Sequence, residues 1–126
     1  MDLMDGYAEK KRQEDKRMKF YKLDGKIVIG GNEGEEVIPN TTDGAYEKHV
    51  PVIEQQGEHV IVKIGAVEHP MLPAHYIEWI VLETATGYQK KDLNPSEKPV
   101  ADFVVTEPII AAYEYCNLHG LWVAKA

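Results

Sequence analysis

The stretch Val60-Ile61-Val62-Lys63-Ile64 decides the fold, because apolar side chains recur in it at every second residue. Successive side chains of a β-strand point to opposite faces, so Val60, Val62 and Ile64 are predicted to share one buried face. The stretch Ile77-Glu78-Trp79-Ile80-Val81 has the same period, which places Ile77, Trp79 and Val81 on one face. Both stretches therefore indicate β-strands with a buried side.

Turn residues divide the rest of this region into runs of similar length. Gln56-Gly57, Thr86-Gly87 and Asn94-Pro95 are typical turn or loop pairs. Further strands are predicted at Tyr88–Leu93, Asp102–Thr106, Ile110–Tyr115 and Leu121–Ala124. About seven short strands without a long amphipathic helix favour an all-β antiparallel sandwich over an α/β fold.

The beginning of the chain has a different character. Residues 7–19 carry many charges and few apolar positions, which is typical of a solvated tail or a frayed helix. Short apolar runs on either side of Asp24-Gly25 predict a small hairpin, and residues 40–44 predict a polar linking loop. We therefore expect an N-terminal appendage over residues 1–40 and a sandwich domain over residues 41–126.

Size and charge limit the classes of function. A chain of 126 residues, 44% of them hydrophobic, suits one main core. The net charge of −7 argues against nucleic acid as a partner, and an anionic substrate would need a local cation to attract it. No apolar run approaches the ~20 residues that cross a bilayer, and the charged N-terminus does not resemble a secretory signal, so we expect a cytoplasmic protein without membrane contact.

Four of the five histidines lie beside prolines, turn residues or strand ends: His49, His69, His75 and His119. Loops at one end of a sandwich can converge although they are distant in sequence, so these side chains could share a metal. The lone Cys116 cannot form an intrachain disulfide, and the Cys116-Asn117-Leu118-His119 spacing lets one tight turn bring a thiolate and an imidazole onto one ion. The fifth histidine, His59, falls within a strand and is predicted to be a surface residue.

The donor set narrows the choice of metal. Four imidazoles and one thiolate exceed the closed four-ligand set of structural zinc and the three protein ligands of most catalytic zinc sites. Imidazole with a single thiolate suits iron or copper better. Four equatorial nitrogens and one axial sulfur would leave a sixth position for a small oxygen ligand, opposite an electron-rich sulfur.

Four ordered segments of the chain resemble the superoxide reductases, the family of desulfoferrodoxin and neelaredoxin. These segments are Glu47-Lys48-His49-Val50-Pro51-Val52-Ile53, Glu68-His69-Pro70-Met71, Ala74-His75-Tyr76-Ile77-Glu78-Trp79 and Tyr113-Glu114-Tyr115-Cys116-Asn117-Leu118-His119-Gly120-Leu121-Trp122. The resemblance covers the chain from about Thr42 to its C-terminus. It implies an immunoglobulin-like β-sandwich or barrel and reduction of superoxide to hydrogen peroxide, without release of dioxygen.

The resemblance also implies roles for individual residues. The metal would be one mononuclear iron per chain, with four equatorial imidazoles and one axial sulfur, from His49, His69, His75, His119 and Cys116. Lys48 matches the family lysine that attracts superoxide and helps to deliver a proton. Glu47 matches the carboxylate that can occupy the sixth position of ferric iron. Trp79 and Trp122 are interpreted as core anchors rather than electron relays.

The N-terminal hairpin looks like a remnant of the rubredoxin-like module that some relatives carry, but it contains no cysteine. Electrons are therefore expected from an external donor, most simply a rubredoxin-type protein, and the resemblance implies a homo-oligomer, a dimer or a tetramer. Two alternatives stay open at this point. A superoxide dismutase would use the same metal and also release dioxygen, and a non-enzymatic iron-binding or electron-transfer module would react only slowly with superoxide.

Overall fold

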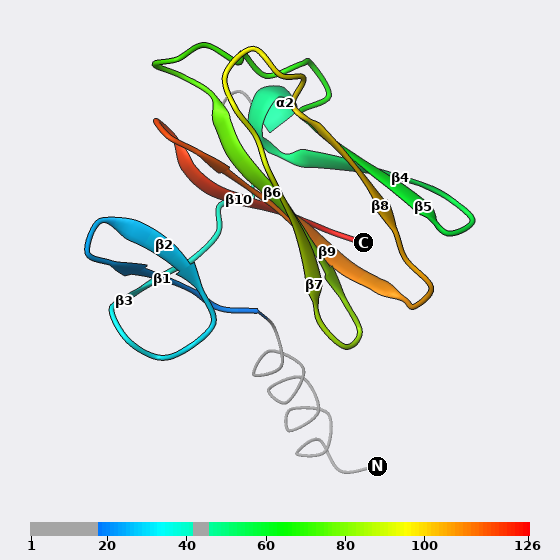
Figure 1. The fold of residues 1–126 in the computed structure, drawn as a ribbon, viewed down its shortest axis with the longest axis horizontal. Coiled ribbons are helices and arrows are strands. Elements are labelled where there is room, and N and C mark those ends of the chain that lie inside the picture. Colours follow the sequence, from blue (N-terminus) through cyan, green and yellow to red (C-terminus); the bar gives the residue numbers. More distant parts are fainter. Residues whose placement is uncertain (1–17, 42–45) are drawn as a thin grey trace, which may run out of the picture. The chain divides into compact units, whose positions relative to one another are not determined.

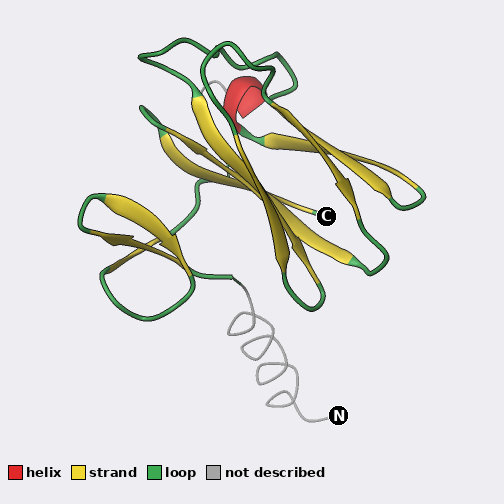
Figure 2. Cartoon of the chain, viewed as in Figure 1, coloured by secondary structure: helices red, strands yellow, loops and turns green. Residues whose placement is uncertain are grey.

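The computed structural model describes residues 18–41 and 46–126, with the side chains of Tyr46 and Glu47 left out of the description. The chain divides into two compact units, Met1–Ile38 and Pro39–Ala126. Most of the charged segment at residues 7–19 lies outside the described residues. Strands make up nearly all of the regular structure (Figure 2).

The described part of the N-terminal unit is a three-stranded antiparallel sheet in the order β2-β1-β3. Its strands are β1 (Phe20–Leu23), β2 (Lys26–Ile29) and β3 (Glu35–Val37). Asp24 and Gly25 connect β1 to β2 with φ angles of 52° and 78°, the double positive φ of a two-residue hairpin turn. The hairpin lies where the sequence predicts it, whereas β3 was not predicted, because Glu35 and Glu36 give this strand little apolar character.

The second unit is a sandwich of two antiparallel sheets, which confirms the predicted all-β class (Figure 1). One sheet has the order β10-β9-β6-β7 and the other has the order β4-β5-β8. Its elements are the four-residue helix α2 (Tyr46–His49) and the strands β4 (Pro51–Gln56), β5 (His59–Ile64), β6 (Ile77–Thr84), β7 (Tyr88–Asp92), β8 (Val100–Val104), β9 (Ile109–Cys116) and β10 (Gly120–Lys125).

The core lies between the two sheets. Val60, Val62 and Ile64 of β5 are buried there as predicted, facing Ile80 and Leu82 of β6. Each such buried aliphatic side chain contributes on the order of 1.5–3 kcal/mol through removal of apolar area from water. Cys116 at the end of β9 belongs to the same core cluster, so its side chain packs against buried apolar side chains.

The predicted alternation in β6 is wrong at its start. Ile77 and Ile80 both belong to the core cluster, whereas Trp79 and Val81 do not, so Ile77 does not share a face with them. The register between β6 and β9 shifts between Ile77 and Trp79, which is the mark of a β-bulge. The bulge begins two residues after His75, and Ile77 is paired with Cys116. It therefore changes the direction of β6 next to these two proposed ligands.

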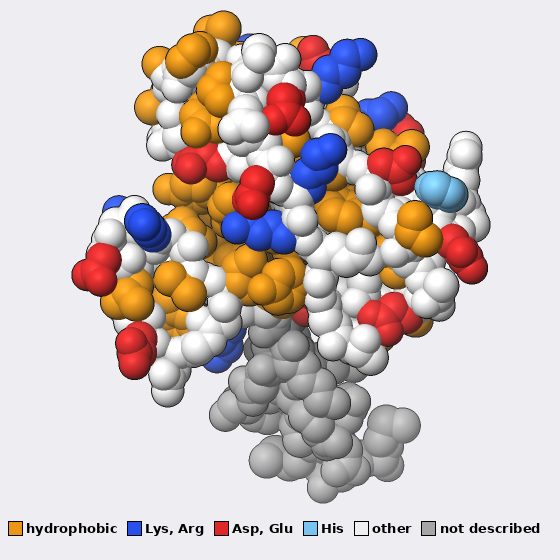
Figure 3. All heavy atoms as spheres, in the orientation of Figure 1, with side chains coloured by type: hydrophobic (Ala, Val, Ile, Leu, Met, Phe, Trp, Pro, Cys, Tyr) orange, Lys and Arg blue, Asp and Glu red, His pale blue; other side chains and the backbone are white. Residues whose placement is uncertain are grey.

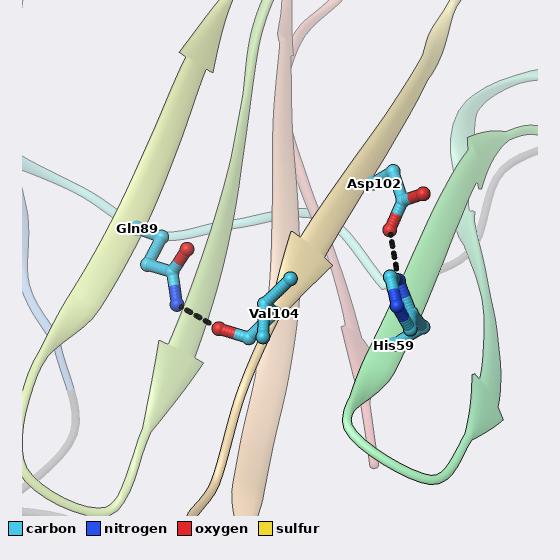
Figure 4. Close-up of polar contacts among 4 residues, drawn as sticks. All are labelled: His59, Gln89, Asp102 and Val104. Atoms are coloured by element: carbon cyan, nitrogen blue, oxygen red, sulfur yellow. Dashed lines mark hydrogen bonds and ion pairs between the residues drawn. The ribbon is translucent and has the colours of Figure 1, made fainter.

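Side chains also connect the two sheets at one side of the sandwich. The Gln89 Nε2 of β7 donates a hydrogen bond of 2.9 Å to the carbonyl oxygen of Val104 in β8 (Figure 4). Across β5 and β8, exposed His59 and Asp102 form a polar pair with 3.3 Å between Nδ1 and Oδ1. His59 therefore lies on the exposed face of the three-stranded sheet, as predicted, away from the other four histidines.

Charges on the surface are mixed. On the face drawn in Figure 3, lysine side chains are scattered among acidic ones and form no continuous basic patch among the described residues. Such a face does not offer the basic stripe that binds a phosphate backbone. None of the described helices has the length and the apolar character needed to span a bilayer.

Candidate metal centre

Three connections at one end of the sandwich bring five potential ligands together. His49 ends α2, and His69 and His75 lie in the β5–β6 connection. Cys116 ends β9, and His119 lies in the β9–β10 turn. Figure 1 shows α2 and the β5–β6 connection at the same end of the sandwich. One potential ligand atom from each of the five residues lies within 4.8 Å of the other four.

The four imidazoles form a square. Ring centroids of neighbouring histidines are separated by 5.0 Å (His49–His69), 4.7 Å (His69–His75), 4.9 Å (His75–His119) and 4.8 Å (His119–His49). Each ring meets the next nearly edge to face, at angles between 66° and 80°. Four nearly equal sides are compatible with four equatorial ligands around one ion.

Distances between donor atoms fit a metal ion. The His49 Nε2 lies 3.1 Å from the His119 Nδ1. Two nitrogens bound at right angles, each ~2.1 Å from a metal, lie ~3.0 Å apart. The sulfur of Cys116 lies 3.7 Å from the His69 Nε2 and 3.8 Å from the His119 Nδ1, about 0.6–0.7 Å more than the ~3.1 Å between adjacent sulfur and nitrogen ligands, so the sulfur would move closer when a metal binds.

Hydrogen bonds show which ring nitrogens face the centre. The Nδ1 of His69 lies 2.7 Å from the Pro70 carbonyl oxygen and donates a hydrogen bond to it. The Nε2 of the neutral ring then carries the lone pair that can bind a metal. The Nε2 of His75 is buried and has no hydrogen-bond partner among the described residues. An orphaned buried nitrogen costs free energy unless a ligand satisfies it. The centre is thus lined by three Nε2 atoms and by the Nδ1 of His119.

Two of the histidines, His69 and His75, are held in the form that binds metals. Burial lowers the pKa of His69 to about 4, aided by the neighbouring imidazoles and opposed by the hydrogen bond to Pro70. Burial also lowers the pKa of His75, together with the charges of His119, His49 and Lys48. Both rings are therefore neutral at physiological pH, and neutral imidazole is the ligand form.

The sulfur lies in a different environment. Cys116 is fully buried, and burial raises the pKa of its thiol. The backbone amides of Leu118 and His119 donate hydrogen bonds to the sulfur and act in the opposite direction. A cation placed at the centre would favour the thiolate strongly, because the thiolate is the form of cysteine that binds metals.

Lys48 and Glu47 precede His49 in α2. The Lys48 side chain is exposed, and its positive charge contributes to the lowered pKa of His75, so the ammonium group acts on the site. The side chain of Glu47 lies outside the described residues. Both residues were singled out from the sequence, and only Lys48 has a described side chain.

Two supporting residues were not predicted as parts of the site. Trp122 was interpreted as a core anchor; it is buried, and its ring also stacks on that of His49. Asn117 was quoted only as part of a motif, and its side-chain amide contacts the segment that carries His75. The sequence signal for both was their position within three residues of a proposed ligand, which does not reveal contacts to distant segments.

Comparisons with known proteins find related sequences and related structures. The sequence profile of the family Desulfoferrodoxin matches residues 41–125. A desulfoferrodoxin homolog from Archaeoglobus fulgidus is 45% identical over 98 residues, which cover 78% of each chain.

Solved structures that are similar to this chain include superoxide reductases. The superoxide reductase from Treponema pallidum has a TM-score of 0.75 and 37% identity, and the match covers 86% of this chain and 100% of that one. A one-iron superoxide reductase from Giardia intestinalis has a TM-score of 0.56 and 35% identity, with 64% of this chain and 97% of that chain covered.

Proposed function

Because this chain belongs to the desulfoferrodoxin family, whose members include superoxide reductases, we propose that it reduces superoxide to hydrogen peroxide at one mononuclear iron. The proposed ligands are His49, His69, His75, His119 and Cys116. The observation that carries the proposal is the square of imidazoles with a sulfur near two of its nitrogens. Five protein ligands leave a six-coordinate ion one position for a small oxygen species.

The donor set suits iron. Neutral imidazoles and a thiolate are ligands that iron binds readily, and the chain offers one donor more than a structural zinc site uses. When bound, ferrous iron would supply one electron and become ferric, while superoxide takes up that electron and two protons and leaves as hydrogen peroxide. The protein's own part is to hold the donors, attract the anion and provide protons.

Lys48 is proposed to attract superoxide. The chain carries a net charge of −7, so an anion approaching it meets a repulsive average field. An exposed ammonium group whose charge reaches His75 reverses the field locally, within a Debye length of ~8 Å at physiological salt. We propose the same group, acting through water, as a route for a proton. Glu47 is proposed as an oxygen donor to ferric iron after the product has left.

Cys116 is proposed to tune the reaction through its environment. Burial removes water from the sulfur, and the amides of Leu118 and His119 stabilise negative charge on it. An electron-rich sulfur donates charge towards the metal, and the hydrogen bonds limit how much. The balance would favour loss of the product over cleavage of its oxygen-oxygen bond.

Electrons are proposed to come from outside the chain. Cys116 is the single cysteine of the sequence, and the described N-terminal sheet carries no second cluster of metal-binding side chains. We propose a rubredoxin-type protein as the donor, residues 41–126 as the iron-binding domain and residues 1–40 as an appendage without a metal. Assembly into a dimer or tetramer and a cytoplasmic location stay predictions.

The decisive experiment reacts the reduced, iron-loaded protein with superoxide and measures dioxygen and peroxide. A reductase yields one peroxide for each ferrous iron oxidised and no dioxygen from turnover. Catalytic release of dioxygen without an added donor would identify a dismutase instead. A rate no faster than simple outer-sphere oxidation would indicate a non-enzymatic iron-binding module.

A further inference from the structure

The side chain of Asn117 bridges two segments that are far apart in the sequence. Its Nδ2 donates a hydrogen bond of 3.0 Å to the carbonyl oxygen of Ala74, and its Oδ1 accepts one of 2.9 Å from the backbone amide of Tyr76. The backbone amide of Asn117 donates a third hydrogen bond, of 3.2 Å, to the carbonyl oxygen of Tyr76. These contacts lie on both sides of His75.

His75 itself is fixed by a second set of bonds. Its backbone amide donates to the Leu72 carbonyl at 3.0 Å, and its own carbonyl accepts from the Leu72 amide at 2.9 Å. Together with the contacts of Asn117, every backbone donor and acceptor from the Ala74 carbonyl to the Tyr76 carbonyl is satisfied. A short connection with this many fixed groups holds the Cα and the Cβ direction of its central residue.

Asn117 follows Cys116 and precedes His119 by two residues, so the bridge joins the segment of one proposed ligand to the turn that carries two others. The His75 and His119 rings lie 4.9 Å apart at an angle of 76°. An asparagine side chain offers a donor NH2 group and an acceptor oxygen on a short stem, which is what the Ala74 carbonyl and the Tyr76 amide require. Aspartate would lack the donor, and alanine would lack both groups.

We propose that Asn117 is a positioning residue of the metal centre: its amide sets His75 in the square of imidazoles relative to Cys116 and His119. This inference rests on the proposed iron site. Residues that orient metal ligands through hydrogen bonds commonly change metal affinity by about 10- to 100-fold when they are replaced. Asn117 touches no reacting atom in this proposal and acts through the backbone that carries His75.

The test compares Asn117→Ala with Asn94→Ala, a matched control in an exposed turn whose amide donates to Glu97. Each protein is purified, stripped of metal and titrated with ferrous iron against a chelator, and the oxidised form is examined by electron paramagnetic resonance. We expect Asn117→Ala to bind iron about 10- to 100-fold more weakly with an altered ferric spectrum, and Asn94→Ala to match the wild type. Wild-type affinity and spectrum in Asn117→Ala would overturn the proposal.

If Asn117 had only a structural role, Asn117→Ala would behave differently. It would lower the melting temperature of the metal-free protein and leave iron affinity and the spectrum unchanged, and this outcome also overturns the proposal. If Asn117→Ala does not fold, Asn117→Asp, which keeps the acceptor for the Tyr76 amide, is measured in the same way. A wild-type protein that binds iron but does not react with superoxide would refute the proposed function alone, because the affinity comparison still decides the role of Asn117.

Discussion

The indole ring of Trp122 stacks on the imidazole of His49, with 4.8 Å between the ring centroids and 19° between the planes. The Nε1 of the same indole donates a hydrogen bond of 3.1 Å to the carbonyl oxygen of His119. One buried side chain therefore contacts two neighbouring members of the imidazole square, whose facing nitrogens are 3.1 Å apart. Trp122 supports the geometry of the centre in addition to filling the core.

Two replacements of Trp122 should distinguish the effects of these two contacts. Trp122→Phe keeps an aromatic ring over His49 and loses the hydrogen bond to His119, at a cost of about 1 kcal/mol. Trp122→Leu also loses the ring stacking, which lowers the stability by about 0.5–1.5 kcal/mol more. It should therefore bind iron more weakly than Trp122→Phe does. The measurements are thermal unfolding of the metal-free protein and iron retention against a chelator. Trp79→Phe is the control, because Trp79 stacks on Tyr115 rather than on a proposed ligand; equal iron loss in Trp79→Phe and Trp122→Leu would refute the special role of Trp122.

Metal binding should release a proton from Cys116. The pKa of its thiol is raised by burial, so the sulfur is protonated in the metal-free protein at pH 7, whereas His69, with a pKa of about 4, is already neutral. Binding of a divalent metal forms the thiolate, so affinity should rise with pH by about tenfold per unit up to the pKa of the thiol. Calorimetry in buffers of different ionisation enthalpy counts the protons. Cys116→Ser should release about one proton fewer, and an unchanged count would show that the sulfur does not bind the metal.

Removing the charge of Lys48 should slow the encounter with superoxide. Lys48→Ile is expected to lower the second-order rate constant on the order of tenfold at low salt and to flatten its dependence on ionic strength. Pulse radiolysis with optical detection gives the rate. Lys91→Ile makes the same change of net charge on exposed strand β7 and should leave the rate almost unaltered. Identical rates and salt dependence for both variants would refute local steering.

The N-terminal sheet offers a test that is separate from the metal. A Cβ atom on Gly34 would collide with the backbone carbonyl of Lys22 in β1, whereas one on Gly31 would meet open space. Both glycines have positive φ, 92° and 79°, so alanine costs about 1–2 kcal/mol of backbone strain at either position. Gly34→Ala should therefore speed hydrogen exchange in β1 and β3 well beyond Gly31→Ala, with iron binding preserved. Equal protection in both variants would contradict the packing of Gly34.

The sequence predicts the sandwich because β5 has one buried face, and such a strand must alternate. It does not predict the bulge at the start of β6, because Ile80, Val81 and Leu82 are all buried and a strand buried on both faces carries no period. Its pattern therefore cannot show which side chains face the core.

The candidate ligands can be predicted from their motifs, since each motif is local in the sequence. The contacts that orient them cannot. The amide of Asn117 reaches a partner 41 residues away, and no pattern within a single segment indicates which distant backbone group it meets. The effect of the Lys48 charge on the pKa of His75 likewise depends on how α2 and the β5–β6 connection fold together.

An anaerobic titration of the metal-free protein with ferrous iron, followed by oxidation and absorption spectroscopy, tests the five-ligand iron site most directly. We expect one iron per chain and a visible sulfur-to-iron charge-transfer band, with the band absent in Cys116→Ser and tight binding lost in His75→Ala. His59→Ala, outside the centre, should behave like the wild type. Persistence of the band in Cys116→Ser, or full iron binding in His75→Ala, would contradict a single iron held by these five side chains.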